Sequence, residues 1–126
     1  MSKLNDQHIA AAMQAYVDAV SGDDVEKILE LYSDDAIVED PVGSEPHEGK
    51  DALRKFYQQA VDMVEAMELE GVVRAREKWG ACAMRAYPKG ANMVVQTLDV
   101  MVFNDDGLIT KMTAYWGQGN LAPREP

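Results

Sequence analysis

The order of two hydrophobic repeats along the chain limits the possible folds more than any other feature. In the first half, apolar residues recur at intervals of three and four, as on one face of a helix. The second half instead alternates apolar and polar residues over short segments separated by turn signals, which is typical of strands joined as hairpins. Helices followed by hairpins, without regular alternation, indicate an α+β fold with an antiparallel sheet.

Three helices are predicted in the first half, over about residues 5–22, 24–32 and 50–67. Asn5 or Asp6 can cap the first helix, and Asp23 or Asp24 the second, because their side-chain oxygens accept hydrogen bonds from free backbone N–H groups. The segment SDD after residue 32 is expected to end the second helix. Each helix then carries one tyrosine on its inward stripe: Tyr16, Tyr32 and Tyr57.

Strands are predicted over about residues 69–77, 80–87, 92–103 and 108–116, and an opening strand precedes residue 40. The tail NLAPREP is expected to be irregular. An antiparallel sheet of this kind can curl around three helices and leave a pocket between the two layers. We expect one domain, residues 1–126, because this length buries about two thirds of the unfolded surface.

Composition narrows the possible partners and location. A net charge of −10 makes nucleic acid and anionic membranes poor partners. The polar start MSKLNDQHIA predicts no signal peptide, and no segment approaches the roughly 20 apolar residues of a membrane span. Cys82 is the only cysteine, which fits a reducing compartment, so a cytoplasmic location is expected. We interpret Cys82 as a small apolar filler.

Two acidic positions conflict with their surroundings. In AIVEDPVGSEP, two adjacent acids end a strand, so one of them should share a face with Ala36 and Val38. In NMVVQTLDVMVF, Asp99 has mostly apolar neighbours on either face. An isolated carboxylate there would be costly to ionise, so its pKa should rise. The alternative is an acid that reaches solvent at a sheet edge or pairs with an arginine, namely Arg74, Arg76 or Arg85.

The three inward tyrosines can be core residues whose hydroxyls bind backbone, or they can converge on the sheet that carries the inward acids. In the second case an apolar cavity holds hydrogen-bond donors and a carboxylate. That set suits proton transfer at carbon beside a carbonyl, which needs a base at the carbon and donors at the oxygen. No metal or other cofactor is indicated, because His8 and His47 lack ligand spacing and no nucleotide-binding motif occurs.

Four segments together resemble the bacterial ketosteroid isomerases (steroid Δ5-isomerases) of the nuclear transport factor two-like superfamily: QAYVDAV, YSDDAIVEDPVGSEPHEGKDALRKFY, TLDVMVF and TAYWGQGNLAPREP. The resemblance covers nearly the whole chain. It implies a cone-shaped α+β fold, with three N-terminal helices packed on a curved, mostly antiparallel sheet that encloses an apolar pocket. It also implies a homodimer that needs no cofactor and acts on a small apolar steroid.

The resemblance gives the unusual residues roles. Asp40 would be the base that moves a proton from C4 to C6 of a 3-keto-Δ5-steroid. Tyr16 and protonated Asp99 would donate to the C3 oxygen as a dienolate forms; ketosteroid isomerase is itself the established example of such a neutral, donating carboxyl group. Three residues would support them through hydrogen bonds, namely Tyr57, Tyr32 and Trp116. The pocket wall would include Val20, Phe56, Met84, Phe103 and Met112.

One departure from the family concerns the substrate. Met84, Ala86 and Tyr87 stand where relatives often carry phenylalanine, so a smaller or differently substituted enone is an alternative to a four-ring steroid. Two other functions also stay open. The chain can be another enzyme of the same fold, such as a polyketide cyclase or a dehydratase, or a non-catalytic module for ligand binding or dimerisation.

Overall fold

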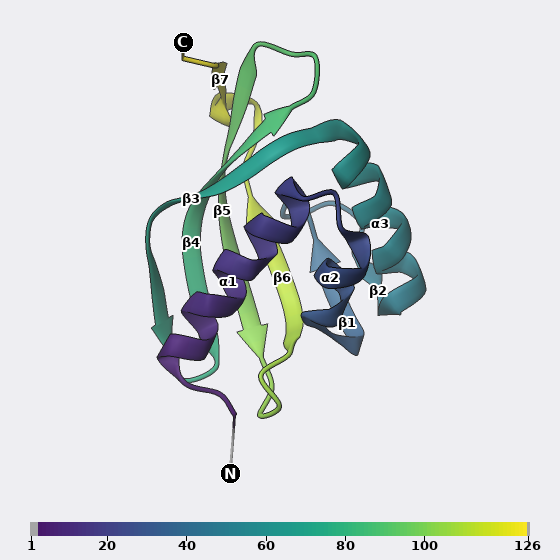
Figure 1. Cartoon of the computed structure of the whole chain (residues 1–126), viewed down its shortest axis with the longest axis vertical. Helices are drawn as coiled ribbons and strands as arrows, with labels where there is room; N and C mark the ends of the chain where they lie inside the picture. The colour runs from purple at the N-terminus through teal and green to yellow at the C-terminus, as the bar shows by residue number, and fades with distance from the viewer. Residues whose placement is uncertain (1–2, 126) are drawn as a thin grey trace.

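The computed structural model describes residues 3–125 and has one helical layer on one sheet. The helices are α1 (Asp6–Ser21), α2 (Val25–Glu30) and α3 (Gly49–Met63). The strands are β1 (Tyr32–Glu39), β2 (His47–Glu48), β3 (Val64–Arg76), β4 (Trp79–Pro88), β5 (Met93–Phe103), β6 (Ile109–Tyr115) and β7 (Leu121–Pro123), with a short 3-10 helix, η1 (Gln118–Asn120), before the last strand. In Figure 1, α1 crosses the sheet and α3 lies towards its β1–β2 side.

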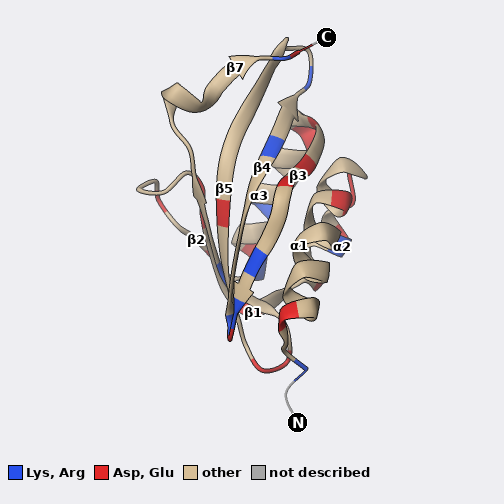
Figure 2. Ribbon diagram, turned by 90° about the vertical axis from the view of Figure 1, so that its left-hand side faces the viewer, with Lys and Arg blue, Asp and Glu red and all other residues tan. Residues whose placement is uncertain are grey.

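The sheet is open, curved and mostly antiparallel. Its strand order is β2-β1-β6-β5-β4-β3, and β7 pairs with β5. Only the β1–β6 pair is parallel among the described strands. Seen from the side, the helices lie on one face of the sheet (Figure 2). The predicted α+β class, with three helices on such a sheet, is therefore confirmed.

The predicted helix caps are present. The Asn5 side chain accepts a hydrogen bond from the backbone N–H of His8, and Gly22 follows the last turn of α1. Asp24 caps α2 by accepting from the backbone N–H of Lys27. These bonds satisfy N–H groups that have no partner inside the helix. None of the described helices is long and apolar enough to cross a membrane.

Several predicted boundaries were wrong. Tyr32 is the first residue of β1 rather than part of α2, and the segment SDD lies inside that strand. The third helix ends at Met63, and residues 64–67 begin β3. The tail is not irregular, because residues 121–123 pair with β5. Apolar residues at 64 and 67 also fit a helical stripe, so the pattern could not locate the change from helix to strand.

The core lies between the helices and the inner face of the sheet. Alternate residues of β5 point into it, including Thr97, Asp99, Met101 and Phe103, all of which are buried. Cys82 is also buried, directly opposite Asp99 on β4, as expected for a small filler. The inner face of the sheet and the helical layer thus place both polar and apolar side chains in one interior.

Candidate active site

Asp40 is the inward-pointing acid of the pair that ends the first strand. It directly follows β1, and its side chain lines a cavity between the helices and the sheet. The loop after it is held at two points: Gly43 N donates to Glu39 Oε2 at 2.6 Å, and Val42 N donates to the Ala114 carbonyl at 2.7 Å. Glu39 therefore fixes the loop, while Asp40 remains available to the cavity.

Trp116 holds the Asp40 carboxyl group. Its Nε1 donates to Asp40 Oδ1 at 2.7 Å. Burial raises the pKa of Asp40, whereas the bond from Trp116 and the nearby His47 lower it. The His47 ring packs on Phe56, with ring centroids 4.7 Å apart. Burial has the largest effect, so the net result is a raised pKa, which makes the Asp40 carboxylate a stronger base than an exposed one.

Asp99 lies at the centre of the sheet, on β5 between Cys82 of β4 and Ala114 of β6. Only 1% of the residue is exposed, and Thr97 Oγ1 donates to its Oδ1 at 2.9 Å. Burial raises the pKa of Asp99 to about 7; repulsion from Asp40 adds to the increase, and the Thr97 bond opposes it. Below neutral pH the group is therefore mostly a neutral acid that can donate a proton in a hydrogen bond.

The alternative environments for Asp99 are contradicted. It is buried in a central strand rather than at an edge. Arg85 forms ion pairs with Glu68 and Glu70, and Arg74 donates to the backbone of Val72. Within residues 3–125, no arginine pairs with Asp99. In this part of the chain, the carboxyl group thus has no opposite charge beside it that would lower the free-energy cost of ionising it in the interior.

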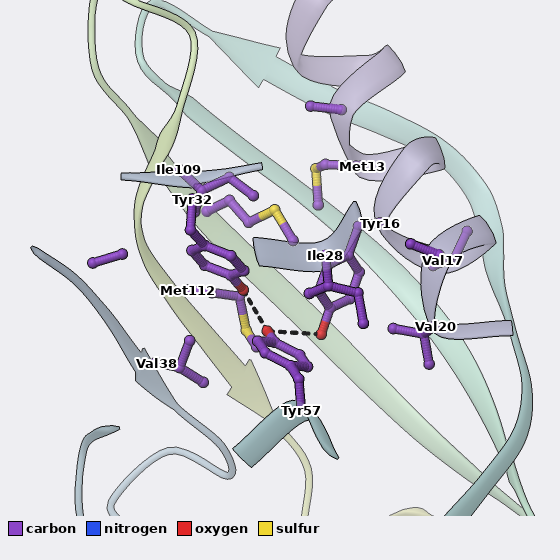
Figure 3. Packing of buried hydrophobic residues seen from close by; sticks show 14 of the residues in the cluster. Met13, Tyr16, Val17, Val20, Ile28, Tyr32, Val38, Tyr57, Ile109 and Met112 are labelled. Carbon is purple, nitrogen blue, oxygen red and sulfur yellow. Dashed lines mark hydrogen bonds between the residues drawn. The ribbon is translucent and has the colours of Figure 1, made fainter. Parts of the chain in front are cut away.

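The three tyrosines converge, although they come from two helices and one strand. The hydroxyls of Tyr16 and Tyr57 are 3.1 Å apart, and Tyr32 forms a short hydrogen bond to Tyr57 (Figure 3). All three side chains are buried, and burial raises each phenol pKa well above its ordinary value. They are therefore neutral donors, and Tyr16, at the end of the chain of hydroxyls, also lines the cavity.

The cavity has a volume of about 220 Å³ and an almost entirely apolar wall. Its polar groups are those of Asp40, Asp99, Tyr16, Tyr57, Thr97 and Trp116. The remaining wall consists of Val20, Phe56, Ala60, Met63, Val64, Met67, Ala86, Pro88 and Val95. The wall thus combines a few donors and carboxyl groups with a mostly apolar surface that suits a hydrocarbon ligand.

Two of the five predicted wall residues, Val20 and Phe56, line the cavity. Met84, Met112 and Phe103 do not, and each is buried in the core instead. Phe103 packs edge-on against His8, towards the far end of β5. Strand alternation identifies which residues face inward, but not how far the cavity extends along the strand.

Sequence reasoning missed most of the wall at the α3–β3 junction, including Met63, Val64 and Met67. The predicted helix continued through this junction, which concealed the change in direction of the chain. Thr97 was also missed as a polar wall residue. Its position two residues before Asp99 was a usable signal, because alternate strand residues share a face.

The two histidines make contacts other than metal coordination. His8 Nε2 is 2.7 Å from the Gly107 carbonyl oxygen, and His47 packs on Phe56. Among the residues that the structure describes, no group of three or more His, Cys, Asp or Glu side chains could hold a metal ion.

Comparison with known proteins agrees with this fold. Residues 13–112 match the model of the SnoaL-like domain family. The chain is 36% identical over 115 residues to a protein named steroid Delta-isomerase from Nocardioides simplex, covering 90% of this chain and 93% of that one. The chain therefore belongs to the SnoaL-like domain family and, within the nuclear transport factor two-like superfamily, to the ketosteroid isomerases.

A solved structure with a different named activity has the same fold. It is the epoxide hydrolase/cyclase-like enzyme SalBIII, described for pyran ring formation in the polyether salinomycin. The TM-score is 0.86 at 26% identity, covering 94% of this chain and 98% of that one. The fold alone thus does not determine the reaction.

Proposed function

We propose that this protein is an isomerase that moves the C=C bond of a 3-keto-Δ5-steroid into conjugation with the ketone. The observation that carries the proposal is that one apolar cavity holds a carboxylate, Asp40, together with two neutral donors, Tyr16 and Asp99. Similarity to the steroid Delta-isomerase of Nocardioides simplex supports the same reaction type.

In the first step, Asp40 removes a proton from C4 of the bound ketone. The electrons of the C4–H bond form a C3=C4 bond, and the carbonyl electrons move to the C3 oxygen, giving a dienolate. Tyr16 and neutral Asp99 donate hydrogen bonds to that oxygen. These bonds strengthen as negative charge accumulates, so they stabilise the transition state more than the substrate.

In the second step, Asp40 returns the proton to C6. The dienolate electrons then reform the C3 carbonyl and leave a C4=C5 bond. The proton taken from C4 is the one returned to C6, so no co-reactant is needed. Trp116 holds one oxygen of Asp40, and the anchored loop fixes the backbone. The second oxygen can then reach two carbons on the same face of the ligand with a small rotation.

The test is an ultraviolet assay for conjugation of 5-androstene-3,17-dione by the purified protein, with Asp40→Asn as the matched variant. Asn keeps the acceptor for Trp116 Nε1 but cannot take up a proton. The proposal expects a rise in enone absorbance with the wild type and almost none with the variant. No rise with the wild type, or equal rates for both proteins, would contradict it.

A second candidate is ring closure of the kind suggested by the similarity to the SalBIII structure. A pair of carboxyl groups with different protonation states can open an epoxide, one as acid and the other as base, so Asp99 and Asp40 suit this chemistry too. Turnover of a hydroxy-epoxide to a cyclic ether, without turnover of the steroid enone, would favour this candidate. A non-catalytic module would instead retain ligand binding and lack both activities.

We also propose a homodimer formed through the outer face of the sheet. Ala83, Leu98 and Tyr115 form a row across β4, β5 and β6, with Leu98 43% and Tyr115 47% exposed. Large exposed apolar side chains in one row favour an interface. Light scattering after gel filtration should give twice the chain mass for the wild type and the chain mass for Leu98→Glu; a monomeric wild type would contradict the interface.

A further inference from the structure

The Thr97 hydroxyl is a polar group of the cavity that the reaction scheme above does not use. Thr97 and Asp99 are two residues apart on β5, so both side chains face inward. Thr97 is only 8% exposed and donates to Asp99 Oδ1 at 2.9 Å. Within the described part of the chain, this is the only hydrogen bond of the Asp99 carboxyl group, and Oδ2 is left without a protein partner.

We propose that Thr97 is a positioning residue that selects which oxygen of Asp99 carries the proton. A neutral carboxyl group has one O–H donor, and its carbonyl oxygen is the better acceptor. Because Thr97 donates to Oδ1, Oδ1 is the carbonyl oxygen and Oδ2 carries the proton. Asp99 then presents its O–H in one fixed orientation. No protein acceptor among residues 3–125 occupies that O–H, so a ligand oxygen can accept its hydrogen bond.

The other titratable groups around Asp99 do not perform this task. They are Tyr16 from α1, Tyr57 from α3, Tyr32 at the start of β1, Asp40 directly after β1 and Cys82 from β4, while β6 places Ala114 opposite Asp99. Burial raises the pKa of the three phenols and of the thiol, so these groups stay neutral. Asp40 acts on Asp99 through charge, which favours the neutral form but does not distinguish its two oxygens.

Removal of the Thr97 hydroxyl should therefore have two effects. A bond donated to a carboxylate stabilises the ionised form, so Thr97→Val should raise the pH at which Asp99 titrates by roughly half to one pH unit. The proton would no longer be confined to Oδ2, so turnover on the acid side of the profile should fall about 5-fold, the effect of one lost hydrogen bond. Thr97→Ser keeps the hydroxyl and should restore both values.

The experiment is a ¹³C NMR titration of the Asp99 carboxyl carbon in the ligand-free protein, with the signal assigned by its loss in Asp99→Asn. Wild type, Thr97→Val and Thr97→Ser are compared with Thr110→Val. Thr110→Val is a matched control because the Thr110 hydroxyl also donates a hydrogen bond, at 3.2 Å, but to the Val102 carbonyl. Melting temperatures are measured in parallel, and Thr97→Ala replaces Thr97→Val if that variant does not fold.

The catalytic consequence rests on the proposed function, but the titration does not, because it needs no substrate. A higher midpoint in Thr97→Val, with wild-type midpoints in Thr97→Ser and Thr110→Val, would support the inference. An unchanged midpoint, even with a lower melting temperature, would overturn it and leave Thr97 a purely structural role. A lower midpoint would also overturn it, because Asp99 would then be donating to Thr97. Absence of steroid turnover by the wild type would count against the proposed function only.

Discussion

The loop after β1 and the centre of β5 each place one carboxyl group in the same cavity, but in different surroundings. Asp40 follows the last residue of a strand, accepts a hydrogen bond from the indole of Trp116 and lies near His47. Asp99 is in the middle of a central strand, has paired strands on both sides and accepts one hydrogen bond from Thr97. The position after a strand thus surrounds the Asp40 carboxylate with a donor and a nearby histidine, whereas the centre of a strand leaves Asp99 with one hydrogen bond.

Repulsion between the two ionised carboxylates is mutual, so the group that ionises second shows the increase in pKa. Repulsion from Asp40 contributes to the raised pKa of Asp99, whereas the pKa of Asp40 is governed by burial, Trp116 and His47. Ionisation of Asp40 therefore helps to keep Asp99 neutral. Two residues of the same type acquire the opposite protonation states that a base and a donor need.

The largest expected effect is loss of the base. Asp40→Asn should lower the isomerisation rate by about 10² to 10⁴, or more where water cannot replace the carboxylate. The variant should keep its fold, because Asn can still accept the bond from Trp116 Nε1. Steady-state rates and circular dichroism of both proteins test this; a folded variant with more than a tenth of the wild-type rate would assign the base elsewhere.

Removal of the central donor should have the next largest effect. Asp99→Leu keeps the bulk but cannot donate, so the rate should fall by roughly 10² to 10³, as for other oxyanion donors. Asp99→Asn keeps an N–H donor and should lie between Leu and the wild type. Rates per folded molecule and melting temperatures are needed together. An unstable Leu variant with a near-normal rate would mean that Asp99 is a structural residue.

A smaller effect should separate donor from base through binding. A phenol of steroid shape, such as equilenin, presents an oxygen that resembles the dienolate oxygen. Tyr16→Phe should weaken its binding by about 10-fold or more, because one hydrogen bond to a partly charged oxygen is lost. Asp40→Asn should bind it at least as well as the wild type, because a negative charge has gone. Calorimetric titration measures both; wild-type affinity in Tyr16→Phe would remove Tyr16 from the oxyanion site.

The last effect concerns the pH dependence of stability rather than rate or binding. The pKa of Asp99 is 3.8 in the reference state and about 7 when folded. Its contribution is fully present below the unfolded value and is lost as pH rises through the folded value, by up to about 4 kcal/mol. Asp99→Asn cannot titrate, so its stability relative to the wild type should increase from pH 4 to pH 8. Urea unfolding at both values measures this; a constant difference would show that Asp99 is ionised throughout.

Much of the fold and part of the candidate site could be predicted from the sequence. Helical stripes located α1, and the apolar neighbours of Asp99 on either face predicted a raised pKa, which agrees with its burial in β5. The pattern around residues 36–40 identified an inward acid, which proved to be Asp40. These features depend on local periodicity, which the sequence displays directly.

The remainder depended on contacts between distant segments. The pattern could not show that Tyr32 begins a strand rather than ending a helix, since its side chain is buried in either case. The resemblance also placed Met84, Met112 and Phe103 in the pocket wall, but helix packing sets the position of the cavity, and none of the three lines it. Only the resemblance to a family, and not periodicity, suggested that Trp116 lies beside Asp40.

The most direct test of the account is whether the two carboxyl groups hold opposite protonation states at one pH. Infrared difference spectra at pH 6 can compare the wild type with Asp99→Asn and with Asp40→Asn. If Asp99 is neutral and Asp40 is ionised, Asp99→Asn should lose a protonated-carboxyl C=O band, whereas Asp40→Asn should lose carboxylate bands and keep the protonated one. Loss of carboxylate absorption in Asp99→Asn, with no change in the protonated region, would contradict the assignment of Asp99 as a neutral donor.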